Sequence, residues 1–196
     1  QLLADAVAKL AEQHYDFEAR KRFIASAEGY SPAVWAQMAA MGLTALTLPS
    51  QHGGFDGGAL DLVATMETLG SALMLEPFVS TVGLGARLVA RLGSAEQQAA
   101  TLPGVADGSL RLALAHAEDH ARHDPTSVRT HAHLEGGQWV LSGAKSMVID
   151  APSADRLLIS ARTSGSEDDA QGISLFLVDA GAQGVSLRTL RTQDNR

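Results

Sequence analysis

The spacing of apolar residues changes near residue 110, and this change limits the folds open to the chain. Before it, apolar residues recur every three or four positions, for example at Leu3, Val7 and Leu10. A period near 3.6 indicates amphipathic helices, whereas a period of two or a short apolar run indicates strands. Short runs and alternation follow residue 110, at positions 112–115, 139–141, 157–161 and 173–178. We therefore predict an α+β protein with an all-α first part and an antiparallel second part.

Local signals for helix starts and turns support this division. The Ser-Pro pair at residues 31–32 is typical of a helix N-cap and first turn. Residues 94–97, Ser-Ala-Glu-Gln, have the spacing of a capping box. The Gly-Gly pair at 136–137 lies between two apolar runs, and glycine readily adopts the positive φ angles of a tight hairpin turn. We expect helices at the first two positions and a hairpin at the third.

The division predicts two domains, residues 1–109 and residues 110–196. The first is expected to be helical. In its run at 60–69 we expect an apolar face with Glu67 at its edge, formed by Leu60, Val63, Met66 and Leu69. Trp35 and Trp139 are expected in the cores of the two domains. The chain begins at Gln1 rather than at a methionine, and we interpret it as part of a longer polypeptide, with the second domain incomplete at its end.

Composition excludes several classes of function. The 196 residues include no cysteine, so disulfides, a thiolate nucleophile and cysteine-bound zinc are ruled out. The net charge of -7 comes from dispersed charges of both signs, which argues against nucleic acid as a partner. The sequence contains no apolar run of the ~20 residues that a membrane span requires, and no signal-peptide pattern. We expect a cytoplasmic protein with no membrane partner.

A group of histidines follows the first expected strand. His116, His120 and His123 are spaced by four and three residues, which on a helix would align imidazoles for a divalent metal. The segment follows a strand and contains Pro125, so a helix is doubtful. A metal site and a solvated polar loop are both open at this point, and the spacing alone does not decide between them. Lys145, after the glycine at 143, is expected to be an exposed hairpin lysine rather than a phosphate ligand.

Four stretches, in this order, carry a resemblance to a known family: "LPSQHGGFDGGALDLVATMETLG", "LGSAEQQAATLPGVADGSLRLALA", "GGQWVLSGAKSMVIDAPSADRLLISART" and "GISLFLVDAGAQGVSLR". Together they cover nearly the whole chain, which resembles the acyl-CoA dehydrogenase family. The segments "AHAE" and "GAKS" look closest to small subunits of the pimeloyl-CoA dehydrogenase type.

The resemblance implies a helical N-terminal domain, a middle β-barrel domain and a C-terminal four-helix domain that is absent from this chain. In the family, a glutamate removes the α proton of an acyl-CoA while FAD accepts hydride from the β carbon. That glutamate usually lies in the C-terminal domain, so no catalytic residue is assigned here and this fragment alone is expected to be inactive.

The resemblance also implies where the flavin is held. The family's Thr-Glu-Pro loop falls on residues 117–119, its Ser-Asp on 123–124 and its Trp-Ile-Thr on 147–149. Three hydroxyls are missing, and each would add about 0.5–1.5 kcal/mol as a hydrogen bond. We therefore expect weak or absent FAD binding and interpret the histidines as replacements within an inherited flavin loop. The implied cofactor-binding residues are His116, Ala117, Glu118, His123, Met147, Val148 and Ile149; no metal-binding residue is assigned.

Three functions follow from these observations. The first is an acyl-CoA dehydrogenase-type flavoprotein subunit of fatty acid metabolism, an oxidoreductase that acts on an acyl-CoA and assembles as a homo- or hetero-oligomer with a related subunit. The second is a non-catalytic, flavin-poor partner subunit of a heteromeric acyl-CoA dehydrogenase. The third is a histidine-rich metal-binding or structural module.

Overall fold

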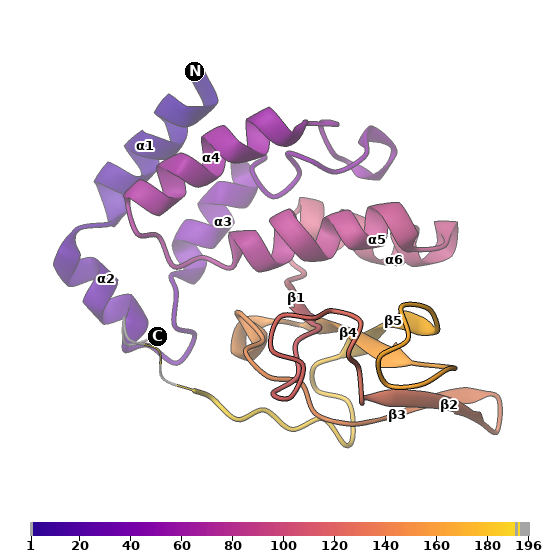
Figure 1. Cartoon of the computed structure of the whole chain (residues 1–196). Helices are drawn as coiled ribbons and strands as arrows, with labels where there is room; N and C mark the ends of the chain where they lie inside the picture. Colours follow the sequence, from indigo (N-terminus) through magenta and orange to yellow (C-terminus); the bar gives the residue numbers. More distant parts are fainter. Residues whose placement is uncertain (1, 191, 193–196) are drawn as a thin grey trace. The chain divides into compact units, whose positions relative to one another are not determined.

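The computed structural model describes residues 2–190 and 192 of the chain (Figure 1). Its internal contacts divide the chain into a helical unit that runs to Arg111 and a β unit, Leu112–Arg188. No helix in the described residues is long and apolar enough to cross a membrane.

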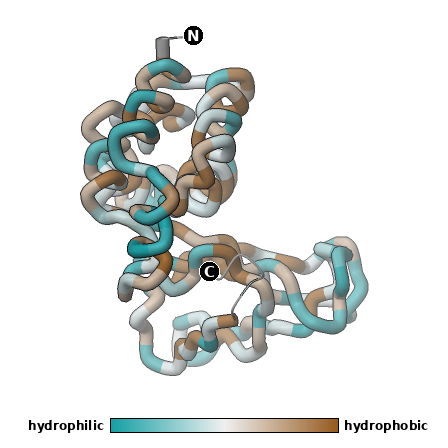
Figure 2. The backbone as a smooth tube through the Cα atoms, turned by 90° about the vertical axis from the view of Figure 1, so that its left-hand side faces the viewer, coloured by the Kyte–Doolittle hydropathy of each residue, from teal (hydrophilic) through white to brown (hydrophobic). Residues whose placement is uncertain are grey.

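The helical unit begins its helices where the capping signals predict. The Oγ atom of Ser31 accepts a hydrogen bond from Val34 N at 3.3 Å. The Ser94 Oγ accepts from Gln97 N at 3.2 Å, while Ser94 N donates to Gln97 Oε1 at 2.8 Å, which completes the capping box. Hydrophobic and hydrophilic residues are interspersed along these helices (Figure 2). The elements are α1 (Leu2–His14), α2 (Phe17–Ile24), α3 (Pro32–Ala40), the 3-10 helix η1 (Ser50–His52), α4 (Ala59–Ser71), the π-helix η2 (Val79–Ala86), α5 (Arg87–Leu92) and α6 (Ala95–Ala106).

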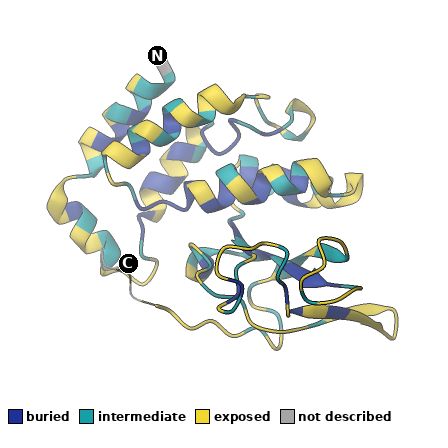
Figure 3. Ribbon diagram, viewed as in Figure 1, coloured by how far each residue is buried: buried dark blue, intermediate teal, exposed yellow. Residues whose placement is uncertain are grey.

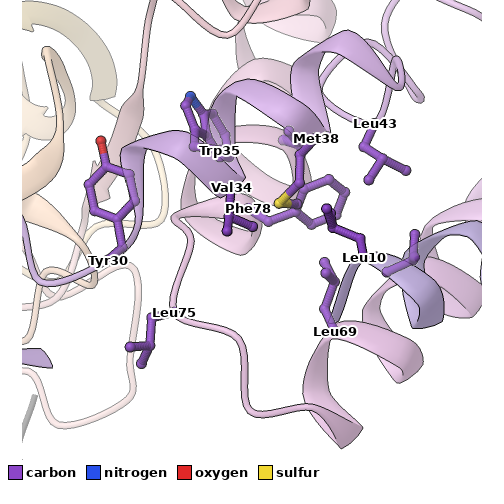
Figure 4. Close-up of a cluster of buried hydrophobic side chains, with 11 residues drawn as sticks. Leu10, Tyr30, Val34, Trp35, Met38, Leu43, Leu69, Leu75 and Phe78 are labelled. Atoms are coloured by element: carbon purple, nitrogen blue, oxygen red, sulfur yellow. The ribbon is translucent and has the colours of Figure 1, made fainter. Parts of the chain in front are cut away.

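The core of the helical unit is formed by apolar side chains from the inner faces of these helices (Figures 3 and 4). Met38 and Phe78 lie close together at its centre, and both are fully buried. Trp35 is also buried, as expected, and its Nε1 donates to Gly108 O at 2.8 Å, which satisfies the polar atom of the ring.

The apolar face of α4 differs from the expectation. Leu60 and Val63 are exposed, whereas Thr65 and Leu69 are buried and Leu62 and Met66 pack on the core. Positions 62, 65, 66 and 69 have the spacing of one helix face. The prediction is confirmed for Met66 and Leu69 and wrong for Leu60 and Val63. A polar residue, Thr65, occupies the centre of the buried face; its Oγ1 donates to Asp61 O at 2.9 Å and so needs no solvent. Glu67 is exposed.

The β unit contains the predicted strands and the predicted hairpin. Strand β2 (His131–Glu135) pairs with β3 (Gln138–Ser142) in antiparallel register, Leu134 opposite Trp139. In the turn between them, Gly136 and Gly137 have φ angles of 57° and 83°. Two positive φ angles favour glycine at both turn positions. The strands are β1 (Leu112–Ala115), β2 (His131–Glu135), β3 (Gln138–Ser142), β4 (Arg156–Arg162) and β5 (Ile173–Asp179), with a 3-10 helix η3 (Ala151–Ser153) before β4.

The sheet is mixed and open in the described residues, not the antiparallel barrel that we expected. Strand β4 pairs in parallel with β1, in antiparallel register with β5, and in parallel with β2 at His131 and Arg162. The order is β1-β4-β2-β3, and β5 pairs with β4. Alternating apolar residues report which face of a strand is buried and carry no information on strand direction, so the parallel pairs were not predictable from the pattern.

Trp139 is 48% exposed and is not a core residue, contrary to the expectation. Its ring meets that of Phe176 edge to face, with centroids 5.3 Å apart. The β2–β3 hairpin is exposed over most of its length (Figure 3), so alternation on this hairpin does not correspond to a buried and a solvated face.

A buried carboxyl group, that of Glu76, joins three segments of the helical unit. The hydroxyl of Tyr15 lies 2.7 and 2.8 Å from its two oxygens, and Ser31 N donates to Oε1 at 3.3 Å. Burial raises the pKa of Glu76 above its ordinary value of 4.5, and the hydrogen bonds only partly oppose this effect. Burial of Glu76 was not predictable from the sequence, because a single glutamate between apolar residues is usually solvated.

We predict that Glu76→Gln removes part of the pH dependence of stability. A carboxyl whose pKa is raised by folding stabilises the protein below 4.5, and this contribution is lost as the pH rises through the folded-state pKa. The free energy of unfolding of Glu76→Gln, relative to that of the parent, should therefore increase from pH 4.5 to pH 7 in urea titrations. The matched control is Glu67→Gln at an exposed position of α4. Parallel pH profiles for parent and Glu76→Gln would contradict the prediction.

Candidate functional site

The histidine-containing segment after β1 is a series of turns. Ala121 N donates to Glu118 O and Asp124 N donates to Ala121 O, both at 3.0 Å, and no helix is present across residues 116–124. The doubt about a helix is thereby confirmed. Because the segment is not a helix, the spacing of seven residues between His116 and His123 does not place them on a common face. Both side chains are exposed. We refer to residues 116–124 as the histidine loop.

The carboxylate of Glu118 points into the β unit and holds the two ends of the connection between β1 and β2. Oε2 accepts from Arg129 N at 2.9 Å, and Oε1 accepts from Thr130 N at 3.0 Å. Oε1 also lies 2.7 Å from Lys145 Nζ. Burial alone would raise the pKa of Glu118, but these hydrogen bonds outweigh it and lower the pKa to about 2. The carboxylate is therefore ionised and used inside the protein, so only the main chain of Glu118 is left for a ligand.

Lys145 is not the exposed hairpin lysine that we expected, because its side chain is 7% exposed. Besides Glu118, its ammonium group donates to Ser160 Oγ at 3.0 Å and to His116 O at 3.4 Å. Burial lowers the pKa of Lys145, and the interaction with Glu118 opposes this. The chain turns inward at Gly143, where a Cβ atom would lie 2.5 Å from Thr130 Oγ1. Sequence reasoning missed this role, although a glycine two positions before a lysine was an available signal of close packing.

The structure brings together two of the segments that the resemblance assigns to the flavin. Ser146 N donates to Ala117 O at 2.9 Å, so residues 116–118 and 145–147 lie side by side. Met147 and Ile149 are 68% and 60% exposed, whereas Val148 packs on the core of the β unit near Ala113, Ala151 and Leu157. Met147 also has a φ angle of 51°, which is uncommon for a residue with a long side chain. Met147, which directly follows Ser146, thus lies close to Ala117 with its side chain exposed, and the Ile149 side chain is exposed two residues further along the chain.

The far end of the histidine loop is closed by Asp124. Its Oδ1 accepts from Thr126 N at 2.9 Å and from Thr126 Oγ1 at 2.7 Å, and these bonds lower the pKa of Asp124. The exposed His123 precedes this turn, and no main-chain hydrogen bond among the described residues joins it to Met147 or Ile149. Contact between the predicted residues and a flavin stays a prediction.

The metal interpretation gains no support. Within the described part of the chain, no group of three or more His, Asp or Glu side chains is placed to hold a metal ion. His120 instead lies between two carboxylates, with Nδ1 3.6 Å from Glu118 Oε2 and Nε2 3.1 Å from Glu167 Oε1.

We predict that Lys145→Met strongly destabilises the chain. The substitution leaves an ionised carboxylate buried without its cationic partner, which typically costs about 3–5 kcal/mol. Urea-induced unfolding should show this loss, and the double variant Glu118→Gln/Lys145→Met should recover part of it. Because folding lowers the pKa of Glu118, its stabilisation is present above 4.5 and is lost as the pH falls towards 2, so the parent and Lys145→Met should converge at acid pH.

The exposed Glu18–Lys21 pair, 3.1 Å apart, supplies the control for that experiment. Lys21→Met should change the free energy of unfolding by less than about 1 kcal/mol, as for other surface pairs. Equal effects of Lys145→Met and Lys21→Met would show that the Glu118–Lys145 pair does not stabilise the site.

Comparison with known proteins identifies both parts of the chain. The family described as "Acyl-CoA dehydrogenase, N-terminal domain" matches residues 1–109, and "Acyl-CoA dehydrogenase, middle domain" matches residues 113–194. Acyl-CoA dehydrogenase FadE12 of Mycobacterium tuberculosis is 29% identical over 187 residues, which cover 94% of this chain and 46% of that protein. The mouse mitochondrial long-chain specific acyl-CoA dehydrogenase is 30% identical over 156 residues, 79% of this chain and 36% of that protein.

Solved structures of similar fold support the same family assignment. A variant of the Tcur3481–Tcur3483 steroid ACAD has a TM-score of 0.82 at 31% identity, over 93% of this chain and 48% of that one. The ChsE4–ChsE5 complex of Mycobacterium tuberculosis has a TM-score of 0.86 at 25% identity, over 98% of this chain and 50% of that one. The chain spans between 36% and 50% of the length of these relatives and solved structures. It belongs to the acyl-CoA dehydrogenase family, of which it contains the N-terminal and middle domains.

Proposed function

We propose that this chain is part of an acyl-CoA dehydrogenase-type flavoprotein subunit that introduces an α,β double bond into an acyl-CoA thioester and transfers hydride to FAD. Membership of the family supports the reaction class. The helical domain, residues 1–109, and the middle domain, residues 110–196, are proposed as its first two domains. A cytoplasmic location and the likeness to the pimeloyl-CoA type stay predictions.

The hydrogen bond from Ser146 N to Ala117 O carries this proposal. It joins two segments, 29 positions apart (Ala117 to Ser146), that the family uses for its flavin. Met147 directly follows Ser146 in the chain, and both Met147 and Ile149 have most of their surface exposed. An exposed pair of apolar side chains next to a polar loop is suited to cover one side of an aromatic ring system, since it supplies apolar contact while the loop supplies donors.

The main chain of the histidine loop fits the needs of a flavin, whereas the side chains fit less well. In the described part of the chain, the N–H groups of Asp119, Arg122 and His123 have no acceptor within the protein. Such donors can stabilise the negative charge that a flavin gains on reduction. Ala117, His123 and Ile149 lack the hydroxyls found in the family pattern, so FAD is expected to bind here with reduced affinity.

The residues of this chain would bind and orient the cofactor rather than carry out the proton transfer. A bound FAD would supply the hydride acceptor. Ala117 and Met147 would position the ring, and the Glu118–Lys145 pair would keep the histidine loop in place from inside. No residue of the chain is assigned as the base that removes the α proton.

A flavin-poor partner subunit is a second candidate function. The three missing hydroxyls favour it, because together they correspond to roughly 2–4 kcal/mol of binding free energy, or about 30- to 1,000-fold in affinity. Two of the structural relatives are described as the ChsE4–ChsE5 complex and the Tcur3481–Tcur3483 steroid ACAD, names that each pair two proteins. In such an assembly this chain would support a related catalytic subunit that holds the flavin and the acyl-CoA.

We predict that the protein binds FAD weakly and that Ala117→Thr/Ile149→Thr tightens FAD binding by about 1–3 kcal/mol. The restored hydroxyls would donate to the flavin, and a titration followed by flavin fluorescence would give the dissociation constant. Val140→Thr, an exposed aliphatic position on β3, is the control and should leave affinity unchanged. Stoichiometric FAD in the purified parent would reject the weak-site prediction, and unchanged affinity after both restorations would reject the assignment of these residues.

We also predict that the 196-residue chain alone does not dehydrogenate any acyl-CoA, because no group in it is assigned to remove the α proton. An assay with an artificial electron acceptor, a panel of acyl-CoA thioesters and saturating FAD tests this. A general acyl-CoA dehydrogenase serves as the positive control. Turnover by the purified chain at enzyme-like rates would show that a base lies within these residues.

A further inference from the structure

The guanidinium group of Arg162, at the end of β4, is buried and bound entirely by main-chain carbonyl groups in the contacts described. The residue is 7% exposed. Nε donates to Val128 O at 3.2 Å, and Nη1 lies 2.9 Å from Gln171 O and 3.4 Å from Ser164 O. Nη2 lies 2.8 Å from both Thr126 O and Glu167 O, and 3.0 Å from Asp169 O.

These six acceptors belong to two separate loops. Thr126 and Val128 end the connection that contains the histidine loop, whereas residues 164–171 connect β4 to β5 and carry three consecutive acids at 167–169. We refer to residues 164–171 as the acidic loop. Arg162 supplies five N–H donors in a planar fork, so it can serve carbonyls on both sides at once. A lysine has three N–H donors and no fixed plane, and could not satisfy this set.

The two loops also contact each other directly. Val128 N donates to Glu167 O at 3.0 Å, and Ser127 Oγ donates to Asp168 Oδ1 at 2.7 Å. The Glu167 carboxylate accepts a hydrogen bond from Arg129 Nε at 2.6 Å and lies 3.1 Å from His120 Nε2, a close contact that lacks hydrogen-bond geometry. His120 is in the histidine loop, so a continuous set of contacts runs from Arg162 through Glu167 to the candidate cofactor site.

We propose that Arg162 is a positioning residue of the candidate flavin site. Its guanidinium fixes the acidic loop against residues 126–128, and Glu167 of the fixed acidic loop then holds His120 and, with it, the exposed main-chain donors of the histidine loop. The effect on FAD rests on the proposed function, whereas the effect on loop order does not. This role predicts that a substitution that weakens the Arg162 hydrogen bonds increases the mobility of the two loops more than that of the rest of the sheet.

Amide hydrogen exchange measured by NMR on the full chain tests this proposal. In Arg162→Lys, the hydrogen-bonded amides of Val128, Arg129 and Thr130 should exchange about tenfold faster, while the central amides of β5 and those of α6 change little. Arg156→Lys is the matched control: it lies on the same strand and its Nε contacts the exposed Asp179 at 3.1 Å. It should leave the loop amides unchanged.

The second readout is FAD affinity in the Ala117→Thr/Ile149→Thr background. Adding Arg162→Lys should raise the dissociation constant about 3- to 10-fold, and adding Arg156→Lys should not. If Arg162→Lys does not fold, Glu167→Gln replaces it, because this change weakens the contacts with Arg129 and His120 while the Glu167 carbonyl still accepts from Arg162. It should speed exchange at Ala121 and Asp124 and raise the dissociation constant in the same direction.

The outcomes separate this proposal from the proposed function. Exchange that rises equally in the loops, β5 and α6 would show a general loss of stability and overturn the positioning role. Faster loop exchange with unchanged FAD affinity would overturn it as well. If neither the parent nor the restored variant binds FAD, the proposed function fails, and positioning of the histidine loop is then decided by the exchange data alone.

Discussion

Glu118 and Arg162 are ionised side chains held inside the β unit, and both are bound largely by the main chain. Removing an ionised group from water is unfavourable unless hydrogen bonds replace its solvation. The carboxylate therefore requires N–H groups, which residues 129 and 130 supply with Lys145, and the guanidinium requires carbonyls, which two loops supply. Each loop follows the path that brings these groups within hydrogen-bond distance, and the remaining geometry of the candidate site depends on those paths.

This arrangement separates what shapes the site from what contacts a ligand. The inward atoms of the histidine loop, the Glu118 carboxylate and the Ala117 carbonyl, are bound within the protein. The outward side chains at Met147 and Ile149 contribute little to the fold because most of their surface is exposed. Outward-facing residues can therefore be replaced without disturbing the histidine loop. This explains how the chain keeps the backbone of the acyl-CoA dehydrogenase family without the expected hydroxyl groups.

The sequence predicted elements well where the signal is local. Ser31 and Ser94 cap helices because a side-chain oxygen three residues before an amide can reach it in almost any context. Partners distant in sequence were not predictable. The parallel pairing of β1 with β4, the inward turn of Lys145 and the six carbonyls around Arg162 depend on the tertiary path of the chain. Trp139 shows the related error of equating an aromatic residue with burial.

The two candidate functions differ by a few side chains and not by fold. A flavin-binding subunit and a flavin-poor partner subunit would both need the Glu118–Lys145 pair and the Arg162 contacts, because these hold the loops in either case. Similarity of the backbone to solved relatives, with a TM-score of 0.82 or 0.86, is therefore expected for both. Three hydroxyl contacts correspond to roughly 30- to 1,000-fold in FAD affinity. A difference of this size can separate a protein that is purified with FAD bound from one that binds FAD only weakly. The choice between the two functions thus depends on the binding free energy contributed at Ala117, His123 and Ile149, which a comparison of folds does not measure.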